Sequence, residues 1–153
     1  MNNHISSLES PHIPVMLNEV IKISSPLNGG VYIDCTFGGG GYSKQLLKFS
    51  KTKVKGLDRD SKVKEIGINL EKNYPLRFKF HQTTFSQINS VTKDLVDVII
   101  FDLGLSSIQL NDLDRGFSFK SNENLDMSMV LNEISSQDAV SYTHLTLPTI
   151  LLV

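Results

Sequence analysis

A run of glycines follows an acidic residue in the segment Asp34-Cys-Thr-Phe-Gly-Gly-Gly-Gly41. Consecutive glycines let the backbone adopt positive φ and pass close to a ligand. The next segment, 42–49, has the apolar spacing of a helix, and the first turn of a helix offers free N–H groups and a positive dipole end. This combination predicts a binding loop for a nucleotide phosphate or for the carboxylate of an amino acid.

Two details distinguish these ligands. The dinucleotide fingerprint G-x-G-x-x-G, started at Gly38, requires glycine or alanine where this chain has Ser43, and the P-loop pattern is also absent. Asp34 stands directly before the loop, where a carboxylate would repel a pyrophosphate. It would favour a ligand with positive charge, such as the amino and sulfonium groups of S-adenosylmethionine. A nicotinamide-dependent dehydrogenase is therefore the less favoured alternative.

Two further acids, Asp58 and Asp102, end later β-prone runs. An acid in the position of Asp58 typically accepts hydrogen bonds from ribose hydroxyls, although it could instead stabilise a helix N-terminus. Phe85 follows the third β-prone run and could pack on an adenine ring, although most phenylalanines belong to the core. The four histidines show no metal-ligand spacing, so no metal is expected.

The elements that must position these residues alternate between strands and helices. Strands are predicted at 31–34, 53–58, 78–81 and 96–102, and the last is expected to be covered on both faces because its apolar run is nearly continuous. Helices are predicted at 42–49, at 61–73 with Ser61 as N-cap, and at 85–91. A first helix is predicted at 12–23, with Pro14 in its first turn and an apolar side made of Val15, Met16, Val20 and Ile23.

This alternation predicts a doubly wound α/β parallel sheet, in which ligands lie outside the carboxyl ends of the strands. Asp34, Asp58 and Asp102 fall at those ends, which indicates one shared site.

The composition sets limits on the class of protein. A length of 153 residues suits one domain, and a net charge of -1 gives no global signal for nucleic acid binding. The single cysteine cannot form an internal disulfide, which fits a cytoplasmic location. No apolar stretch is long enough for a membrane span, so no membrane partner is expected. The polar segment 1–11 is expected to be disordered.

Further motifs accompany the glycine loop: Gly56-Leu-Asp-Arg-Asp60, Phe101-Asp-Leu-Gly-Leu-Ser-Ser-Ile-Gln-Leu110, Asp114-Arg-Gly-Phe-Ser-Phe119 and Leu125-Asp-Met-Ser-Met129. Together with His12-x-Pro14-Val15 they resemble the MraW/RsmH family of S-adenosylmethionine-dependent ribosomal RNA methyltransferases. The resemblance covers about residues 12–140, and the motifs beginning at Phe101 and Asp114 are its most specific part.

The resemblance implies a Rossmann-like class I methyltransferase fold. Here the doubly wound sheet would be incomplete, with about the first four strands and without the family's helical insertion and final strands. The implied cofactor is S-adenosyl-L-methionine. The implied partner is 16S rRNA in the small ribosomal subunit, methylated on the exocyclic amino nitrogen of a cytosine.

The loop residues Asp34 and Gly38 are expected to contact the cofactor, and the resemblance implies further contacts at Gly40, Gly41, Tyr42, Asp58, Phe85, Asp102 and Gln109. Asp102 and the backbone carbonyl of Leu103 are the expected catalytic groups, because they stand where they could accept hydrogen bonds from the target amino group.

The chain also departs from the family pattern. Tyr42 stands where many relatives have histidine, and Ser128 replaces the arginine of the L-D-M-R-M motif. The polar residues of 106–117 could position RNA or cofactor, or could bond their own backbone. Among them Arg115 is the candidate for a phosphate contact.

Segment 12–140 is thus expected to be a partial cofactor-binding domain, and 141–153, which does not resemble the family, to be a non-native tail. We expect activity in the full-length parent, and marginal stability for this chain because a cut sheet leaves an open edge. The chain would then be an inactive fragment. The alternative is a fragment that binds the cofactor without catalysis.

Overall fold

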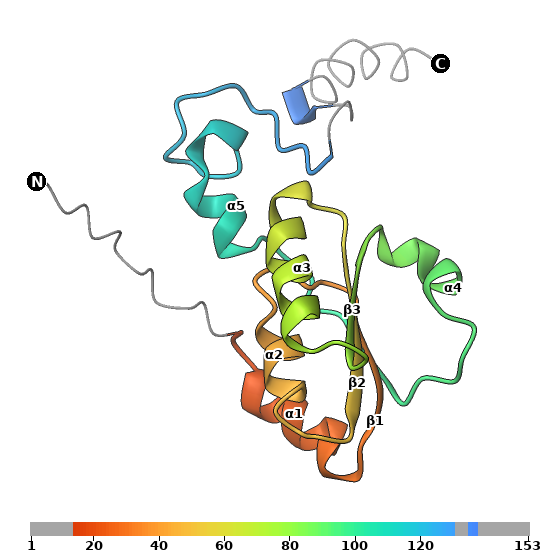
Figure 1. Cartoon of the computed structure of the whole chain (residues 1–153). Coiled ribbons are helices and arrows are strands. Elements are labelled where there is room, and N and C mark those ends of the chain that lie inside the picture. Colours follow the sequence, from red (N-terminus) through yellow and green to blue (C-terminus); the bar gives the residue numbers. More distant parts are fainter. Residues whose placement is uncertain (1–13, 131–134, 138–153) are drawn as a thin grey trace, which may run out of the picture.

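The computed structural model describes residues 14–130 and 135–137. Four parallel strands form one sheet in the order β3-β2-β1-β4 (Figure 1). Their bounds are Gly30–Asp34 for β1, Thr52–Asp58 for β2, Phe78–Gln82 for β3 and Val98–Ile100 for β4. The predicted parallel α/β sheet of about four strands is confirmed. The predictions for 1–11 and 141–153 concern segments outside the described residues.

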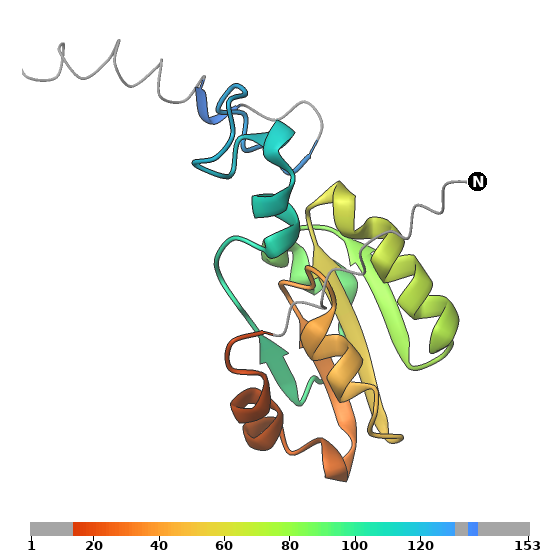
Figure 2. The same ribbon diagram turned by 90° about the vertical axis from the view of Figure 1, so that its left-hand side faces the viewer.

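Helices cover both faces of the sheet (Figures 1 and 2). One face carries α1 (Leu17–Ser24), α2 (Gly41–Leu46) and α3 (Lys64–Asn73), and the other carries α4 (Ile88–Val91). A fifth helix, α5 (Ser107–Asn111), lies beyond the carboxyl ends of the strands. Short 3₁₀ turns occur at Pro26–Asn28, Ser61–Val63, Phe85–Gln87 and Leu113–Arg115. No helix of the described segments is long and apolar enough to cross a membrane.

The core has one part on each face, because successive side chains of a strand point to opposite sides. Tyr32 of β1 packs in the larger cluster with residues of α2, α3 and β2, while Ile33 packs with Leu57 and the α4 region. Both Tyr32 and Ile33 are fully buried. The pairing of β1 with β2 in register, Asp34 opposite Gly56, brings the carboxyl ends of the two strands to the same edge of the sheet.

The predicted first helix begins later than expected, and its predicted apolar side is only partly correct, because Val20 packs on the core whereas Val15, Met16 and Ile23 are exposed. Pro14 precedes the helix, since the Leu17 N–H donates to the Pro14 carbonyl at 3.3 Å and α1 starts there. The side chains that pack on the core are Leu17, Val20 and Ile21, whereas Ile23 is 83% exposed. Val15 and Met16 precede α1, so they cannot form part of the helix side that faces the sheet.

The predicted cap of the third helix is also wrong. Ser61 is exposed, and the capping carboxylate belongs to Asp60, which accepts from the Lys62 N–H at 3.0 Å. A Ser61–Val63 turn separates this cap from α3 itself, in which Leu70 faces the core as predicted.

The last strand is shorter than predicted and is not covered on both faces. In β4, Ile100 is buried, whereas Ile99 is 47% exposed. β4 stands at one end of the sheet order, so it has a strand neighbour on one side only among the described elements. A continuous apolar run therefore did not distinguish a two-sided core strand from an edge strand here.

Candidate functional site

A cavity of about 430 Å³ lies at the carboxyl edge of the sheet. This volume falls within the ordinary range of small-molecule sites. Its wall includes all the predicted site residues except Asp34 and Gly40, namely Gly38, Gly41, Tyr42, Asp58, Phe85, Asp102, Leu103 and Gln109. The structure therefore brings together residues that are up to 71 positions apart, counting from Gly38 to Gln109.

The glycine loop is held in a tight, specific shape. The Phe37 N–H donates to the Leu57 carbonyl at 2.9 Å, and the buried Phe37 ring packs 5.6 Å from that of Phe78. Gly40 has a φ of 77°, and a Cβ at this position would lie 2.9 Å from the Phe37 ring. Gly40 therefore shapes the loop from behind rather than lining the cavity, because only glycine fits over Phe37 with this backbone.

Asp58, at the end of β2, links the loop to the cavity. Its Oδ2 accepts from the Gly38 N–H at 2.7 Å, and its Oδ1 accepts from the Asp60 N–H at 2.9 Å. Burial raises the pKa of Asp58, while these backbone hydrogen bonds oppose the rise. Each carboxylate oxygen can accept more than one hydrogen bond, so Asp58 retains acceptor capacity toward a ligand in the cavity.

Asp34 lies behind the loop rather than on the cavity wall. It is fully buried, and the Ser43 hydroxyl donates to its Oδ2 at 2.7 Å. Burial raises the pKa of Asp34 to about 6. The predicted position of Asp34 at the end of β1 is correct. Its side chain, however, accepts a hydrogen bond from Ser43 of α2 and does not face the cavity.

Phe85 stands at the rim with 48% of its side chain exposed. Its ring lies edge-on to that of Phe101, with 5.6 Å between the centroids. A half-exposed aromatic ring at the rim is available for stacking on a planar ligand group, whereas a core phenylalanine would not be.

Asp102 lies beyond the end of β4, which is separated in the sheet from β2 and Asp58 by β1. The Thr36 hydroxyl accepts from its N–H at 2.8 Å, which fixes the backbone at this point. The Tyr42 phenol faces its carboxylate: burial first, and then the charge of Asp102 and a hydrogen bond to it, raise the pKa of Tyr42. The Asp102 side chain is otherwise exposed at the cavity, as an acceptor for a ligand would need to be.

The polar residues after Asp102 are mostly paired with the protein itself. Ser106 and Gln109 form a reciprocal capping box at the start of α5. The Gln109 Nε2 and the Arg115 guanidinium both donate to Asp60 Oδ2, at 3.1 and 2.9 Å. Arg115 is only 9% exposed. Of the two alternatives for these polar residues, bonding within the protein is the one the structure shows for Arg115, because its guanidinium is buried against a carboxylate.

No group of three or more His, Cys, Asp or Glu side chains able to hold a metal occurs within 14–130 and 135–137. The cavity wall carries three acids, Asp58, Asp60 and Asp102, together with Arg59, a glycine loop and an aromatic rim. The residues present fit S-adenosylmethionine, since Asp58 and Asp102 offer acceptors to a polar organic ligand with positive charge.

Comparison with known proteins gives the family. A sequence model of the MraW methylase family matches residues 9–151. The chain belongs to this family.

Two curated relatives illustrate the match. The ribosomal RNA small subunit methyltransferase H of Anaplasma phagocytophilum (strain HZ) is 39% identical over 137 residues, covering 87% of this chain and 46% of that protein. The protein of the same name from Rickettsia bellii (strain OSU 85-389) is 43% identical over 135 residues, covering 88% of this chain and 44% of its own length. The chain thus spans less than half the length of these MraW relatives.

Among solved structures, an rRNA methylase from Streptococcus thermophilus aligns over 95% of this chain and 81% of its own, with a TM-score of 0.46 and 12% identity. Family membership rests on the sequence matches alone.

Sequence reasoning missed two residues that the structure brings to the site. Asp60 anchors Gln109 and Arg115, and Thr36 fixes the backbone of Asp102. The only signal for Asp60 was a second acid two positions after Asp58, within the Gly56–Asp60 motif.

Proposed function

We propose that this chain carries the cofactor-binding half of an S-adenosylmethionine-dependent methyltransferase that modifies the exocyclic amino nitrogen of a cytosine in small-subunit rRNA. The observation that supports it best is the cavity at the carboxyl edge of the sheet, which joins the glycine loop, Asp58 and Asp102 in one wall. Family membership supports the reaction class. A ribosomal RNA substrate implies a cytoplasmic location.

The proposed assignments divide the cavity into two sides. Asp58 would accept hydrogen bonds from the ribose hydroxyls, and Phe85 would pack on the adenine ring. Gly38 and Gly41, with Gly40 behind them, would let the backbone approach the amino-acid part of the cofactor. Gln109 would shape the wall formed by the residues after Asp102, because its amide oxygen already accepts from the Ser106 N–H and its amide nitrogen already donates to Asp60.

S-adenosylmethionine, when bound, supplies a methyl group on a positively charged sulfur. The amino nitrogen of cytosine is a weak nucleophile because its lone pair is delocalised into the ring. The protein must therefore hold the amino group at the correct angle and accept its protons. The Asp102 carboxylate and the Leu103 carbonyl, at the end of β4, are the groups proposed for these hydrogen bonds. The target base must leave its stack to reach them.

Calorimetric titration of the 153-residue chain with S-adenosylmethionine tests the cofactor assignment, with NAD as the control ligand. We expect binding of S-adenosylmethionine, no binding of NAD, and at least about a tenfold weaker affinity in Asp58→Ala, because hydrogen bonds to a charged group contribute about 1.5–3 kcal/mol. Asp94→Ala removes an equally charged but largely exposed carboxylate that is not part of the cavity, and should leave the affinity unchanged. Equal losses in both variants would contradict the role of Asp58.

A test of the proton-acceptor role of Asp102 requires a full-length version of the protein together with its rRNA substrate. Asp102→Asn keeps the size and the backbone contact with Thr36 but removes the basic carboxylate. We expect the single-turnover methylation rate to fall by about 10²-fold or more, as for loss of a general base, with little change in cofactor affinity. An Asp102→Asn enzyme that methylates at the normal rate would rule this role out.

A further inference from the structure

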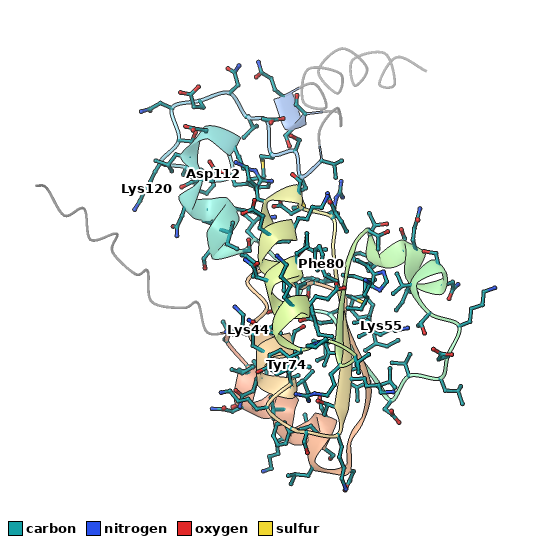
Figure 3. The ribbon with its side chains drawn as sticks, viewed as in Figure 1. Lys44, Lys55, Tyr74, Phe80, Asp112 and Lys120 are labelled. Atoms are coloured by element: carbon teal, nitrogen blue, oxygen red, sulfur yellow. The ribbon has the colours of Figure 1, made fainter. Side chains whose placement is uncertain are left out.

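The segment from Leu103 to Val130 forms one wall of the cavity, and we call it the strap. It supplies Leu103, Gly104, Leu105, Ser106, Gln109 and Met129 to the cavity that the glycine loop and Asp58 also line. Figure 1 shows α5 and the chain that follows it beyond the carboxyl ends of the strands, and Figure 3 labels Asp112 and Lys120 there.

Asp60 is the buried group that joins the strap to the sheet. Its side chain is 1% exposed, and its Oδ2 accepts from both Gln109 and Arg115 of the strap. Two weaker links lie beside it: the Ser61 N–H donates to the Met129 carbonyl at 3.2 Å, and Lys62 pairs with Asp112 at 3.4 Å.

Arg115 also contacts the C-terminal end of the strap. The second guanidinium nitrogen of Arg115 donates to the Ser128 carbonyl at 2.9 Å, and the backbone carbonyl of Arg115 accepts from the Met127 N–H at 2.9 Å. The guanidinium also lies 5.0 Å from the centre of the Phe117 ring. One guanidinium therefore ties the middle of the strap to its end, and Asp60 fixes that guanidinium to the end of β2.

A capping role alone does not account for this arrangement. The Ser61–Val63 turn needs only one oxygen of Asp60, the Oδ1 that accepts from Lys62. The other oxygen accepts from the two strap side chains, and a buried guanidinium is costly unless a carboxylate compensates its charge.

We propose that Asp60 is a positioning residue for cofactor binding. Asp60 borders the cavity, but its side chain is only 1% exposed and both of its oxygens accept from protein groups, so it acts by holding the strap in place to complete the cavity wall with the glycine loop. The inference rests on the proposed function, because it takes the cavity to be the S-adenosylmethionine site. The two acids, which are two positions apart, then have different roles: Asp58 contacts the ligand and Asp60 holds the strap.

The test measures the dissociation constant of S-adenosylmethionine by calorimetry for the 153-residue chain and its variants. Asp60→Asn leaves the buried Arg115 guanidinium without a compensating negative charge, and we expect at least about a tenfold weaker affinity. The double variant Asp60→Asn/Arg115→Gln removes both charges and leaves two amides that can pair, so it should recover to within about threefold of the original affinity. Such recovery would show that Asp60 acts through its pairing with Arg115.

Asp112→Asn is the matched control, because it breaks the more exposed Lys62 pair between the same two segments. Its affinity should not change. Hydrogen exchange on the same samples should show faster exchange in 103–130 of Asp60→Asn, with β1 and β2 unchanged. An unchanged affinity in Asp60→Asn, or a double variant no better than the single one, would overturn the proposal.

If Asp60→Asn does not fold, Arg115→Lys replaces it. A lysine keeps the charge opposite Asp60 but lacks the planar fork that also reaches the Ser128 carbonyl. We expect a loss of affinity of about tenfold with the sheet intact, and an unchanged affinity would overturn the proposal. Failure of the unaltered chain to bind S-adenosylmethionine would instead contradict the proposed function, and this inference with it.

Discussion

Asp34 is an acid without solvent exposure, and its ionisation is therefore coupled to folding. Burial raises its pKa from 3.8 to about 6, although the Ser43 hydroxyl and the Thr36 N–H partly stabilise the charged form. The folded chain consequently holds this proton more tightly than the unfolded chain does. The contribution of Asp34 to stability is present in full below the unfolded pKa and is lost as the pH rises through the folded pKa.

Asp34→Asn removes this dependence while keeping an oxygen that can accept from Ser43. Between about pH 4 and pH 7 the free energy of unfolding of the unaltered chain should fall relative to Asp34→Asn by at most about 3 kcal/mol, since each pKa unit corresponds to about 1.4 kcal/mol. Urea unfolding of both proteins across this range checks it. Asp58, whose pKa is also raised, is present in both proteins, so its effect largely cancels. A difference that does not change with pH would contradict the assignment to Asp34.

At the scale of the elements, β4 differs most from its prediction. Ile99 is 47% exposed and Phe101 is 51% exposed, next to a strand edge without a described neighbour. Exposed apolar groups beside an open edge favour association between chains. Ile99→Thr keeps a β-branched residue in the strand but makes the exposed face more polar.

We expect Ile99→Thr to reduce the rate of aggregation several-fold, measured by light scattering at matched concentration, with a change in unfolding free energy below about 1 kcal/mol. Ile100→Thr is the control, since Ile100 is only 6% exposed. That substitution puts a hydroxyl into the core and should destabilise the chain by about 1–3 kcal/mol. Equal aggregation of Ile99→Thr and the unaltered chain would show that this face is not the one that associates.

At the scale of the whole molecule, local sequence patterns predicted the bounds of the strands well, but they predicted poorly which side chains are buried against other elements. The strands β1, β2 and β3 lie within one residue of their predicted bounds, because alternating β-prone runs and turn residues are local signals. The two-sided burial of β4 was wrong because burial depends on neighbours that its own residues do not specify. The apolar side of α1 was only partly correct because the local pattern did not give the start of the helix, and Val15 and Met16 precede it.

The site shows the same division. Asp58 and Asp102 were located because carboxyl ends of parallel strands converge on one edge. Arg115 was a candidate for a phosphate contact and is found paired with Asp60, a residue 55 positions away in the sequence. No local rule gives the partner of a buried charge at that separation, so the anchor of the strap became visible only in the fold.

The strand order also bears on how the molecule acquires its site during folding. β1 pairs with β2 after a short connection, whereas β4 must return to β1, and the Asp102 N–H reaches Thr36 across 66 positions. Closing a longer loop costs more entropy, so contacts of short sequence separation tend to form earlier. The loop of Gly38 and the end of β2 can thus assemble before Asp102 arrives. A ligand that contacts both Asp58 and Asp102 would then bind only chains in which β4 has already paired with β1. Ligand binding would therefore mark the completion of folding.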